Sequence, residues 1–544
     1  MAYKGKFDRS QKQNNEAQNQ IDESKELIVE PQDEFEEQHQ IDDACNDIDE
    51  TQDQIEKPHA KKKRRNLLPL WIFVLIIGIC GFINSFERRE YPVENAQTDP
   101  TVETVEMSTT APIETEEPTI APTTEPLETE PVTEPTAEET EPEETVPEET
   151  KPAPVVYNAT VGAMGNLVMH KPIFNVSTYG SIVQQPDGSY NFESVFKYIK
   201  DNISEFDYAA VNLETTLAGT GNGYQYGGYP NFNCPDEIVV GLKDAGFDML
   251  LTANDHSSDT GMIGFNRTLE VIRKEGLTSL GTYQSVDEKN WVVNDLNGVN
   301  VGMICYTWAS GETSDGRPTL NGNTHVAQSG LCNYFYSKNL DAFYKEVGVY
   351  IAEMEAAGAD ATMMFIHWGG QYQSEPTKEQ KEIAQKLCDM GIDVIVGSHP
   401  YIIQPIELIQ SSVDPNHKTF CIYSTGNALS NYRSGSLDNI KTAHTEDGIM
   451  FYVVFEKVDD GDAEVSYVNV LPTWVNMRID ANGRREYNII PLDVNEEDRW
   501  QDTFGLSDEE LKKAKDSHKR TMDIVGEGLQ SAHEYLIQQA HTWQ

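Results

Sequence analysis

The sequence has few basic residues for its length. Of 544 residues, 41 are Lys or Arg and 90 are Asp or Glu, so the formal net charge is -49 at pH 7. Proteins with a general nucleic-acid-binding surface neutralise phosphates with clustered Lys and Arg side chains. We therefore expect no nucleic-acid partner, and a polyanionic partner would have to be met by a local site or a bound metal.

Cysteines are also sparse and irregularly placed. The seven cysteines include no CxxC pair, which disfavours a zinc knuckle or a disulfide framework. Three of them, Cys305, Cys388 and Cys421, lie inside apolar runs and are predicted to be small core residues. Cys234 and Cys332 are the only pair in a loop-like context, so a disulfide between them stays open.

Large apolar residues are scarce in two segments of the N-terminal part. Residues 1–65 and 88–154 are rich in Glu, Asp, Gln, Thr and Pro. Such segments cannot bury enough apolar surface to offset the entropy lost on ordering. We predict a disordered acidic segment at 1–65 and an extended Thr/Glu/Pro-rich stalk at 88–154, because prolines favour polyproline II and like charges repel.

One long apolar run, residues 66–87, separates these two segments. Its uncharged stretch of about 20 residues matches the thickness of a bilayer. Consecutive basic residues at 61–65 precede it, and the positive-inside bias places the N-terminus in the cytoplasm and the main domain outside the cell. We predict a single-pass signal anchor in the cell membrane. A cleaved signal peptide is the alternative, but the run begins far from the N-terminus and lacks an A-x-A site.

The rest of the chain is predicted to fold as an α/β domain. From 155 to 495, short apolar runs alternate with amphipathic segments. After Tyr401 the pattern changes to strands with few long helices, so we expect these strands to form a second sheet packed on the first. Residues 496–544 are predicted as a C-terminal helical extension, in which apolar residues recur every three or four positions. Gly526 and Gly528 weaken the second half of that helix.

Two histidines stand at equivalent positions of a strand–helix–strand unit. His367 follows the apolar run 361–366, and His399 follows the run 393–396 after an intervening helical pattern. Two strands joined by such a crossover lie parallel. Both histidines should therefore reach the carboxyl edge of the sheet, where open α/β sheets bind ligands. We interpret the pair as part of a site rather than as polar residues that merely flank strands.

Polar side chains follow three further apolar runs in the same way. They are Asn166 after 160–164, Glu214 after 208–211, and Asp255 with His256 after 248–253. Polar residues flank many strands, which explains any one of these cases. Five strand ends that all offer Asn, Glu, Asp or His side chains favour a site that binds metal or moves protons.

Several motifs occur in a fixed order along the chain. They are NLE at 212–214, ANDH at 253–256 followed by Asp259-x-Gly261, HWG at 367–369, Pro376 with Gln380, GSHPY at 397–401 and YSTGN at 423–427. Together they resemble the bacterial capsule synthesis protein CapA family, a branch of the calcineurin-like metallophosphoesterases, over about residues 160 to 454. The resemblance implies a four-layer αββα sandwich of two mixed β-sheets with a two-metal site at the strand ends. It also implies a part in making or anchoring poly-γ-glutamate or a related surface polymer.

Three positions of the expected site depart from the family pattern. The first family motif is Gly-Asp, whereas this chain has Asn166 after the glycine. The Asn-His of the third motif is Asp255-His256, and the final His-Pro-His ends in Tyr401. The first change removes an anion, the second adds one, and the third replaces a nitrogen donor by a neutral phenol. Asn166 and Asp255 have in effect exchanged charges, whereas Tyr401 has no such counterpart.

The resemblance also implies roles for individual residues. The expected ligands of one or two divalent ions are Asn166, Glu214, Asp255, His367 and His399. Such a mixed nitrogen and oxygen set suits manganese, iron or zinc better than calcium. His256 would be the general acid beside the metal. His170 is either a further ligand or a structural loop histidine.

These observations lead to two functional hypotheses. The first is a membrane-anchored protein of capsule or related surface-polymer biosynthesis that acts as a metal-dependent hydrolase or transferase. Its partner would be an anionic surface polymer or the biosynthetic machinery of that polymer. The alternative is a non-catalytic protein that binds the polymer or a synthase through a degenerate site. The changes at Asn166 and Tyr401 favour the alternative, and the presence of Glu214, His256 and His367 favours catalysis.

Overall fold

The computed structural model describes residues 154–175, 180–435 and 442–542. The predicted cytoplasmic segment 1–65 and signal anchor 66–87 lie outside these residues, as does the predicted stalk 88–154 except for its last residue. Within the described part, a search for a helix with the length and hydropathy of a membrane span finds none.

The first β-sheet is mixed and has eight strands. Strands β1 to β4 are parallel, and the later strands β15, β16 and β17 extend the sheet antiparallel from the other side of β1. The bounds are β1 (Val156–Val168), β2 (Tyr208–Glu214), β3 (Met249–Leu251), β4 (Thr278–Leu280), β14 (Asn427–Leu429, paired with β1), β15 (Asp447–Val458), β16 (Ala463–Ile479) and β17 (Arg485–Pro491).

The second β-sheet is also mixed, with parallel strands at its centre and antiparallel strands at both edges. Its order is β12-β13-β11-β10-β6-β5, with β9 paired to β6. The bounds are β5 (Val292–Leu296), β6 (Val299–Trp308), β9 (Tyr334–Phe335), β10 (Ala361–His367), β11 (Val394–Ser398), β12 (Ile403–Gln410) and β13 (Lys418–Thr425). A separate hairpin consists of β7 (Gly311–Glu312) and β8 (Pro318–Thr319).

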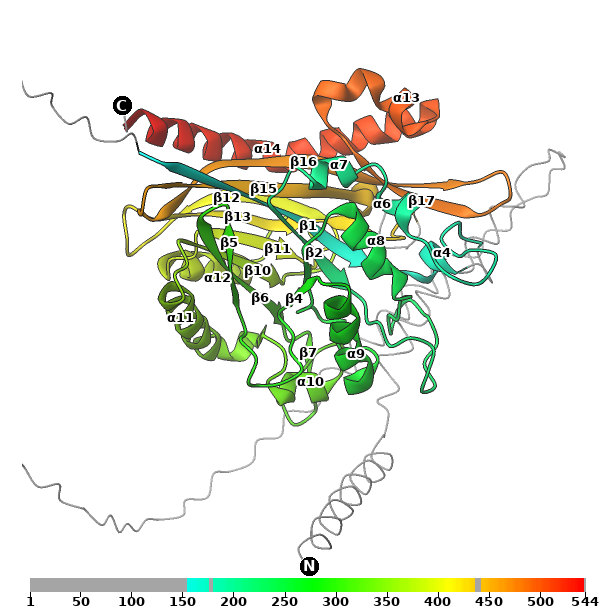
Figure 1. Cartoon of the computed structure of the whole chain (residues 1–544), viewed down its shortest axis with the longest axis horizontal. Helices are drawn as coiled ribbons and strands as arrows, with labels where there is room; N and C mark the ends of the chain where they lie inside the picture. The colour runs from blue at the N-terminus through cyan, green and yellow to red at the C-terminus, as the bar shows by residue number, and fades with distance from the viewer. Residues whose placement is uncertain (1–153, 176–179, 436–441, 543–544) are drawn as a thin grey trace, which may run out of the picture. The chain divides into compact units, whose positions relative to one another are not determined.

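Helices such as α8, α11 and α12 lie on the outer faces of the two sheets (Figure 1). Their bounds are α4 (Lys171–Phe174), α6 (Glu193–Phe196), α7 (Lys200–Ile203), α8 (Glu237–Ala245), α9 (Gly261–Lys274), α10 (Thr324–Ser329), α11 (Leu340–Ala356), α12 (Lys378–Asp389), α13 (Trp500–Phe504) and α14 (Asp508–Thr542). Apolar residues of α6 and α8 pack on the first sheet, and those of α11 and α12 pack on the second. The layers therefore run helix, sheet, sheet, helix, as the resemblance implies.

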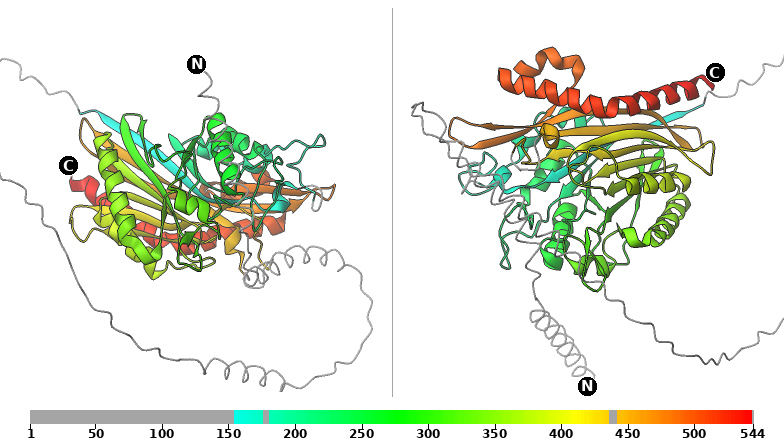
Figure 2. Two further views of the ribbon diagram at one scale, coloured as in Figure 1. Left: turned by 90° about the horizontal axis from the view of Figure 1, so that it is seen from below. Right: turned by 180° about the vertical axis from the view of Figure 1, so that it is seen from behind.

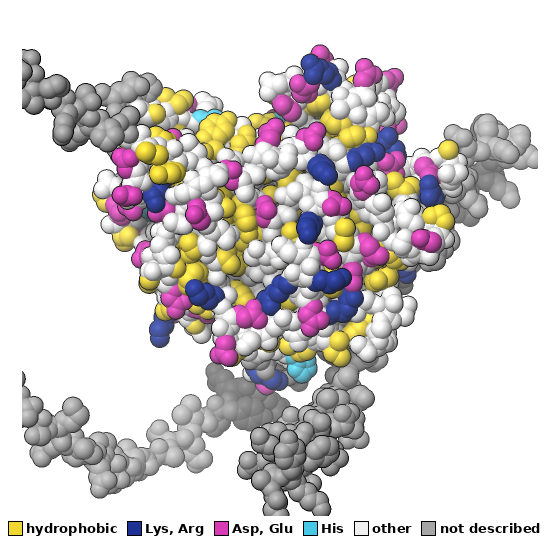
Figure 3. All heavy atoms as spheres, viewed as in Figure 1, with side chains coloured by type: hydrophobic (Ala, Val, Ile, Leu, Met, Phe, Trp, Pro, Cys, Tyr) yellow, Lys and Arg dark blue, Asp and Glu magenta, His cyan; other side chains and the backbone are white. Residues whose placement is uncertain are grey.

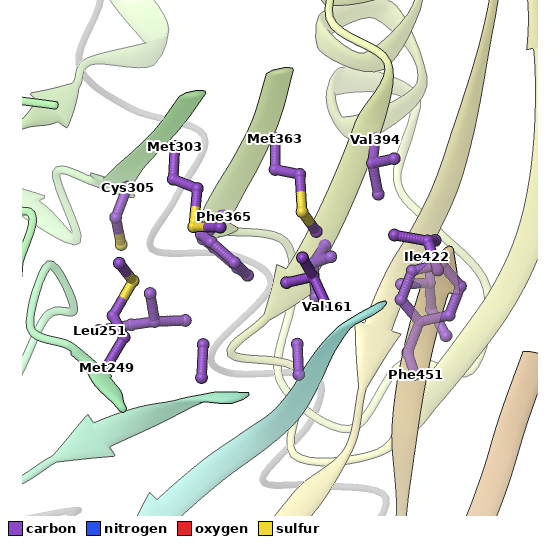
Figure 4. Close-up of a cluster of buried hydrophobic side chains, with 14 of the residues drawn as sticks. Val161, Met249, Leu251, Met303, Cys305, Met363, Phe365, Val394, Ile422 and Phe451 are labelled. Carbon is purple, nitrogen blue, oxygen red and sulfur yellow. The ribbon is translucent and has the colours of Figure 1, made fainter. Parts of the chain in front are cut away.

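The largest apolar core lies between the two sheets. In Figure 4, Met303 and Met363 of the second sheet point toward Val161 and Leu251 of the first. Five cysteines in the described residues are buried and free, which confirms the core prediction for Cys305, Cys388 and Cys421. The disulfide left open between Cys234 and Cys332 is not formed.

The division of the sheets predicted at Tyr401 is wrong. Strands β12 and β13 join the sheet that already contains β10 and β11, whereas β15, β16 and β17 join β1. Strand β1 pairs with β2 along one side. Along its other side it pairs antiparallel with β15 over nine residues, beginning with Val156 opposite Val458. Apolar patterns show that a strand exists, but they do not identify its partner.

The parallel arrangement predicted for the two histidine strands is confirmed. Strand β10 pairs with β11 in parallel, and His367 lies opposite Ser398. Helix α12 connects the strands and begins with a capping box, in which Thr377 and Gln380 satisfy each other's backbone N–H groups. This unit fixes His367 and His399 at the same end of the second sheet.

Helix α14 lies along β12 and β16 and adds Val525, Leu529 and Ala532 to the core between the sheets (Figure 2). Its attachment also includes the buried Asp447, which accepts hydrogen bonds from Ser517 at 2.6 Å and from Arg520 at 2.8 and 2.7 Å. The helix is therefore an integral layer of the domain.

Candidate metal centre

The predicted site residues come together where strand ends of both sheets meet. Asn166, Glu214 and Asp255 lie on or just after β1, β2 and β3 of the first sheet, whereas His367 and His399 lie at the ends of β10 and β11 of the second. All of these residues, and His256, are at most 6% exposed. The site is thus built between two sheets rather than along the edge of one sheet.

Asp255, His367 and His399 form one group of potential ligands. The Nε2 atom of His367 lies 3.0 Å from Asp255 Oδ1 and 3.0 Å from His399 Nδ1, and the latter atom lies 3.9 Å from Asp255 Oδ1. Metal bonds of about 2.0–2.2 Å place neighbouring ligand atoms roughly 3–3.5 Å apart. The two 3.0 Å separations match adjacent corners of one coordination polyhedron, and the 3.9 Å separation would have to shorten slightly when an ion binds.

The protonation states of this group also suit a metal ion. Burial alone would raise the pKa of the Asp255 carboxyl, but His256, His367 and His399 outweigh burial and hold that pKa well below its usual range. Burial lowers the pKa of His399 to about 3, more than the charge of Asp255 can offset. An ionised carboxylate and a neutral imidazole are the forms that bind metal.

Glu214, Asp255 and His256 form a second group of close ligand atoms. Here Tyr401 donates its hydroxyl hydrogen to Glu214 Oε1 at 2.6 Å, and Asn212 Nδ2 lies 3.3 Å from Glu214 Oε2. Burial raises the pKa of the Glu214 carboxyl, although the neighbouring histidines and the Tyr401 hydroxyl oppose this effect. Both oxygens of Glu214 therefore already have protein partners.

His256 is held by a carboxylate three residues further along the chain. Its Nδ1 atom lies 2.8 Å from Asp259 Oδ2, and Asp259 also accepts hydrogen bonds from the Phe232 N–H and from Asn321 Nδ2. Burial by itself lowers the pKa of His256, but Asp259, Asp255 and Glu214 raise it to about 10. His256 is thus an imidazolium at neutral pH and can donate a proton.

A chain of buried asparagine side chains supports the site. Asn212 Nδ2 donates to Asn166 Oδ1 at 2.9 Å, and Asn254 Nδ2 donates to Asn212 Oδ1 at 3.1 Å. The Asn166 oxygen also accepts a hydrogen bond from the His399 backbone N–H at 3.2 Å. Asn166 therefore positions His399, and its role as a direct ligand stays a prediction.

Sequence reasoning missed Asn212, Asn254 and Asp259 as functional positions. All three stand inside the NLE and ANDH motifs or directly after them. Their signal was the three-residue spacing of Asp259 from His256 and the asparagine that each motif contains. Only the convergence of strands β1, β2 and β3 shows that these amides contact one another.

His170 lies beside this centre but outside both groups of close ligand atoms. Its Nδ1 atom accepts a hydrogen bond from the Asn431 backbone N–H at 3.2 Å, and its ring packs edge-on against Phe232 and Tyr432. Burial lowers the pKa of His170 to about 3. Of the two interpretations of His170, these contacts favour a structural loop histidine.

The loop after β11 holds two residues in strained backbone conformations. His399 has φ 96° and Tyr401 has φ 59°, a region that costs residues other than glycine about 1–3 kcal/mol each. These conformations turn His399 toward His367 and Tyr401 toward Glu214. Strain is thus concentrated at the two residues that complete the site.

Comparison with protein families gives one match over this region. Residues 160–432 match the family model described as bacterial capsule synthesis protein PGA_cap. The chain is 26% identical over 250 residues to a protein of Bacillus subtilis (strain 168) named PGA biosynthesis protein CapA. It is also 26% identical over 251 residues to the capsule biosynthesis protein CapA of Bacillus anthracis. The matches cover 46% of this chain, and 60% and 56% of the two relatives.

Among solved structures, one similar chain is a putative 5'-nucleotidase from Staphylococcus aureus in complex with alpha-ketoglutarate. The match has 14% sequence identity and a TM-score of 0.35, and covers 60% of this chain and 56% of that chain.

Proposed function

The chain belongs to the bacterial capsule synthesis protein PGA_cap family, and we propose from this that it takes part in the biosynthesis of poly-γ-glutamate or a related surface polymer as a metal-dependent hydrolase or transferase. The observation that supports catalysis is the convergence of Asp255, His367 and His399 beside the proton donor His256. A calcineurin-like metallophosphoesterase fold is part of this proposal. Because the matched relatives are longer than the region they share with this chain, activity and substrate are both proposals.

Each residue of the site has a chemical task in this proposal. Asp255, His367 and His399 would hold a divalent ion such as manganese, iron or zinc, which supplies Lewis-acid polarisation of a phosphoryl or acyl oxygen when bound. His256 keeps its Nδ1 hydrogen bonded to Asp259 and can give the Nε2 proton to the leaving oxygen. The buried position of the group excludes bulk water, which strengthens these interactions.

Replacing His256 by Gln tests the catalytic part of the proposal. The variant should hydrolyse a phosphodiester with a basic alkoxide leaving group roughly 100- to 10,000-fold more slowly than the unaltered full-length protein, the usual contribution of a positioned general acid. Its content of divalent metal should stay the same, because Asp255, His367 and His399 are untouched. Equal rates for the two proteins would show that His256 is not the general acid.

The non-catalytic alternative has one specific observation in its favour, the hydrogen bond of Tyr401 to Glu214. A polymer-binding protein with a degenerate metal site would retain polymer, yet the unaltered chain would show no metal-dependent hydrolysis of phosphodiester or acyl substrates. The same assay therefore separates the two functions.

We also propose that residues 66–87 anchor the protein in the cell membrane, with residues 1–65 in the cytoplasm. The support is the basic cluster at 61–65 before the apolar run. In intact cells, a membrane-impermeant maleimide should not label Cys45, but should label a Thr101→Cys substitution made in a Cys45→Ser background. Labelling of Cys45 in intact cells would contradict this topology.

A further inference from the structure

We propose that the centre holds a single divalent ion, on Asp255, His367 and His399, and that Tyr401 excludes a second ion from the neighbouring position at Glu214. This inference rests on the metal-dependent function proposed above. It differs from the two-metal site that the family resemblance implies, and it rests on the contacts that this chain's own residues make.

Tyr401 occupies the second position with a group that binds metal poorly. Its hydroxyl is 2.6 Å from Glu214 Oε1, and the residue is 2% exposed. Its carbonyl oxygen accepts a hydrogen bond from Asn427 Nδ2 at 2.8 Å, and its ring packs against those of His399 and Tyr372. The phenol is therefore fixed, and it acts as a donor toward the carboxylate that a second ion would need.

The other side chains around Glu214 are also held by hydrogen bonds. His256 is bonded through Nδ1 to Asp259 at 2.8 Å, and the Asn166 oxygen is shared between Asn212 Nδ2 and the His399 N–H. A second ion at this position would have to compete with each of these hydrogen bonds. The ligand atoms of Asp255, His367 and His399 also contact one another, at 3.0 to 3.9 Å, but an ion bound there would take the place of these mutual contacts.

Charge balance also favours one ion. Two carboxylates, Glu214 and Asp255, face the centre, whereas Asp259 is paired with His256. At most two negative charges therefore face the centre, so a second divalent cation would leave an excess of at least two positive charges among buried residues. Uncompensated buried charge is strongly unfavourable, and neither Asn166 nor Tyr401 supplies an anion to offset it.

Native mass spectrometry of the full-length protein, titrated with Mn²⁺ or Zn²⁺, tests the inference. We expect one ion per chain in the unaltered protein and two in the Tyr401→His variant. Tyr401→Phe is the matched control, because it removes the hydroxyl without adding a nitrogen donor, and it should still bind one ion. All three side chains meet the same backbone requirement of φ 59°, so the substitutions add no new strain.

Two further variants identify which half of the centre holds the ion. Glu214→Gln should retain one ion, whereas His367→Ala should bind it only at a much higher metal concentration. Two ions in the unaltered protein, one ion in Tyr401→His, or loss of the ion in Glu214→Gln would each overturn the inference while leaving metal-dependent function intact. Binding of no ion by the unaltered protein would instead overturn the proposed function, and this inference with it.

Discussion

Asp255→Asn is expected to weaken Mn²⁺ binding by more than about 100-fold, beyond the roughly 10- to 100-fold lost when a partner outside the ligand set is removed. Asp255 is the only anion in the group with His367 and His399, and its Oδ1 lies 3.0 Å from His367 Nε2. The Asn side chain keeps the shape of Asp but removes the negative charge that attracts the ion. Titration calorimetry on the full-length protein measures the change.

Two variants of Asn166 serve as controls for this result. Asn166→Ala should weaken binding less, because it removes only the hydrogen bonds that position Asn212 and His399. Asn166→Asp should strengthen binding, since it adds an anion beside the centre. If Asp255→Asn bound Mn²⁺ as tightly as the unaltered protein, Asp255 would not be a ligand.

Gly528→Ala should destabilise the folded domain by about 2–3 kcal/mol. A Cβ atom at position 528 would lie 1.9 Å from the Ile406 carbonyl oxygen of β12. A Cβ is fixed by the backbone and cannot rotate away, so the helix would have to move from the sheet. This cost exceeds the roughly 1 kcal/mol that Ala gains over Gly in a helix. Denaturant unfolding of the full-length protein gives the free energy.

Gly526→Ala is the matched control in the same helix. Nothing lies within 4 Å of a Cβ at that position, so the variant should be more stable by up to about 1 kcal/mol through helix propensity alone. Opposite signs for the two variants are the expected outcome. Stabilisation of similar size by both would mean that α14 does not pack this closely on β12.

Helix propensity alone does not reveal that α14 packs closely on β12 at Gly528. The prediction treated Gly526 and Gly528 alike, as residues that weaken the second half of the helix. In the structure Gly528 is required by a close approach to another element, whereas Gly526 is not. Propensity concerns one helix alone, and the close approach depends on β12, more than 100 residues earlier in the chain.

For the fold and the site as well, local relations could be predicted from the sequence, whereas contacts between distant segments could not. Apolar runs located strands such as β2 and β10, and the crossover rule placed His367 and His399 correctly, because these are local relations. The partners of β15, β16 and β17 were missed, since pairing with β1 depends on contacts between distant segments. The amide network of Asn212 was missed for the same reason.

The distribution of charged side chains over the surface does not follow from the composition alone. On the face shown in Figure 3, Lys and Arg side chains are interspersed with Asp and Glu. Among the described residues, Arg273 lies 2.6 Å from Glu288, which is one such pairing of opposite charges. On this face the positive side chains therefore do not form a separate basic patch.

X-ray absorption at the zinc edge of the full-length protein, loaded with one equivalent of Zn²⁺, tests the central claim most directly. We expect two imidazole ligands with Zn–N distances of about 2.0–2.1 Å together with oxygen ligands, and one imidazole in the His367→Ala variant under saturating Zn²⁺. A spectrum without imidazole scattering, or one that is the same in the variant, would contradict the assignment of the ion to Asp255, His367 and His399.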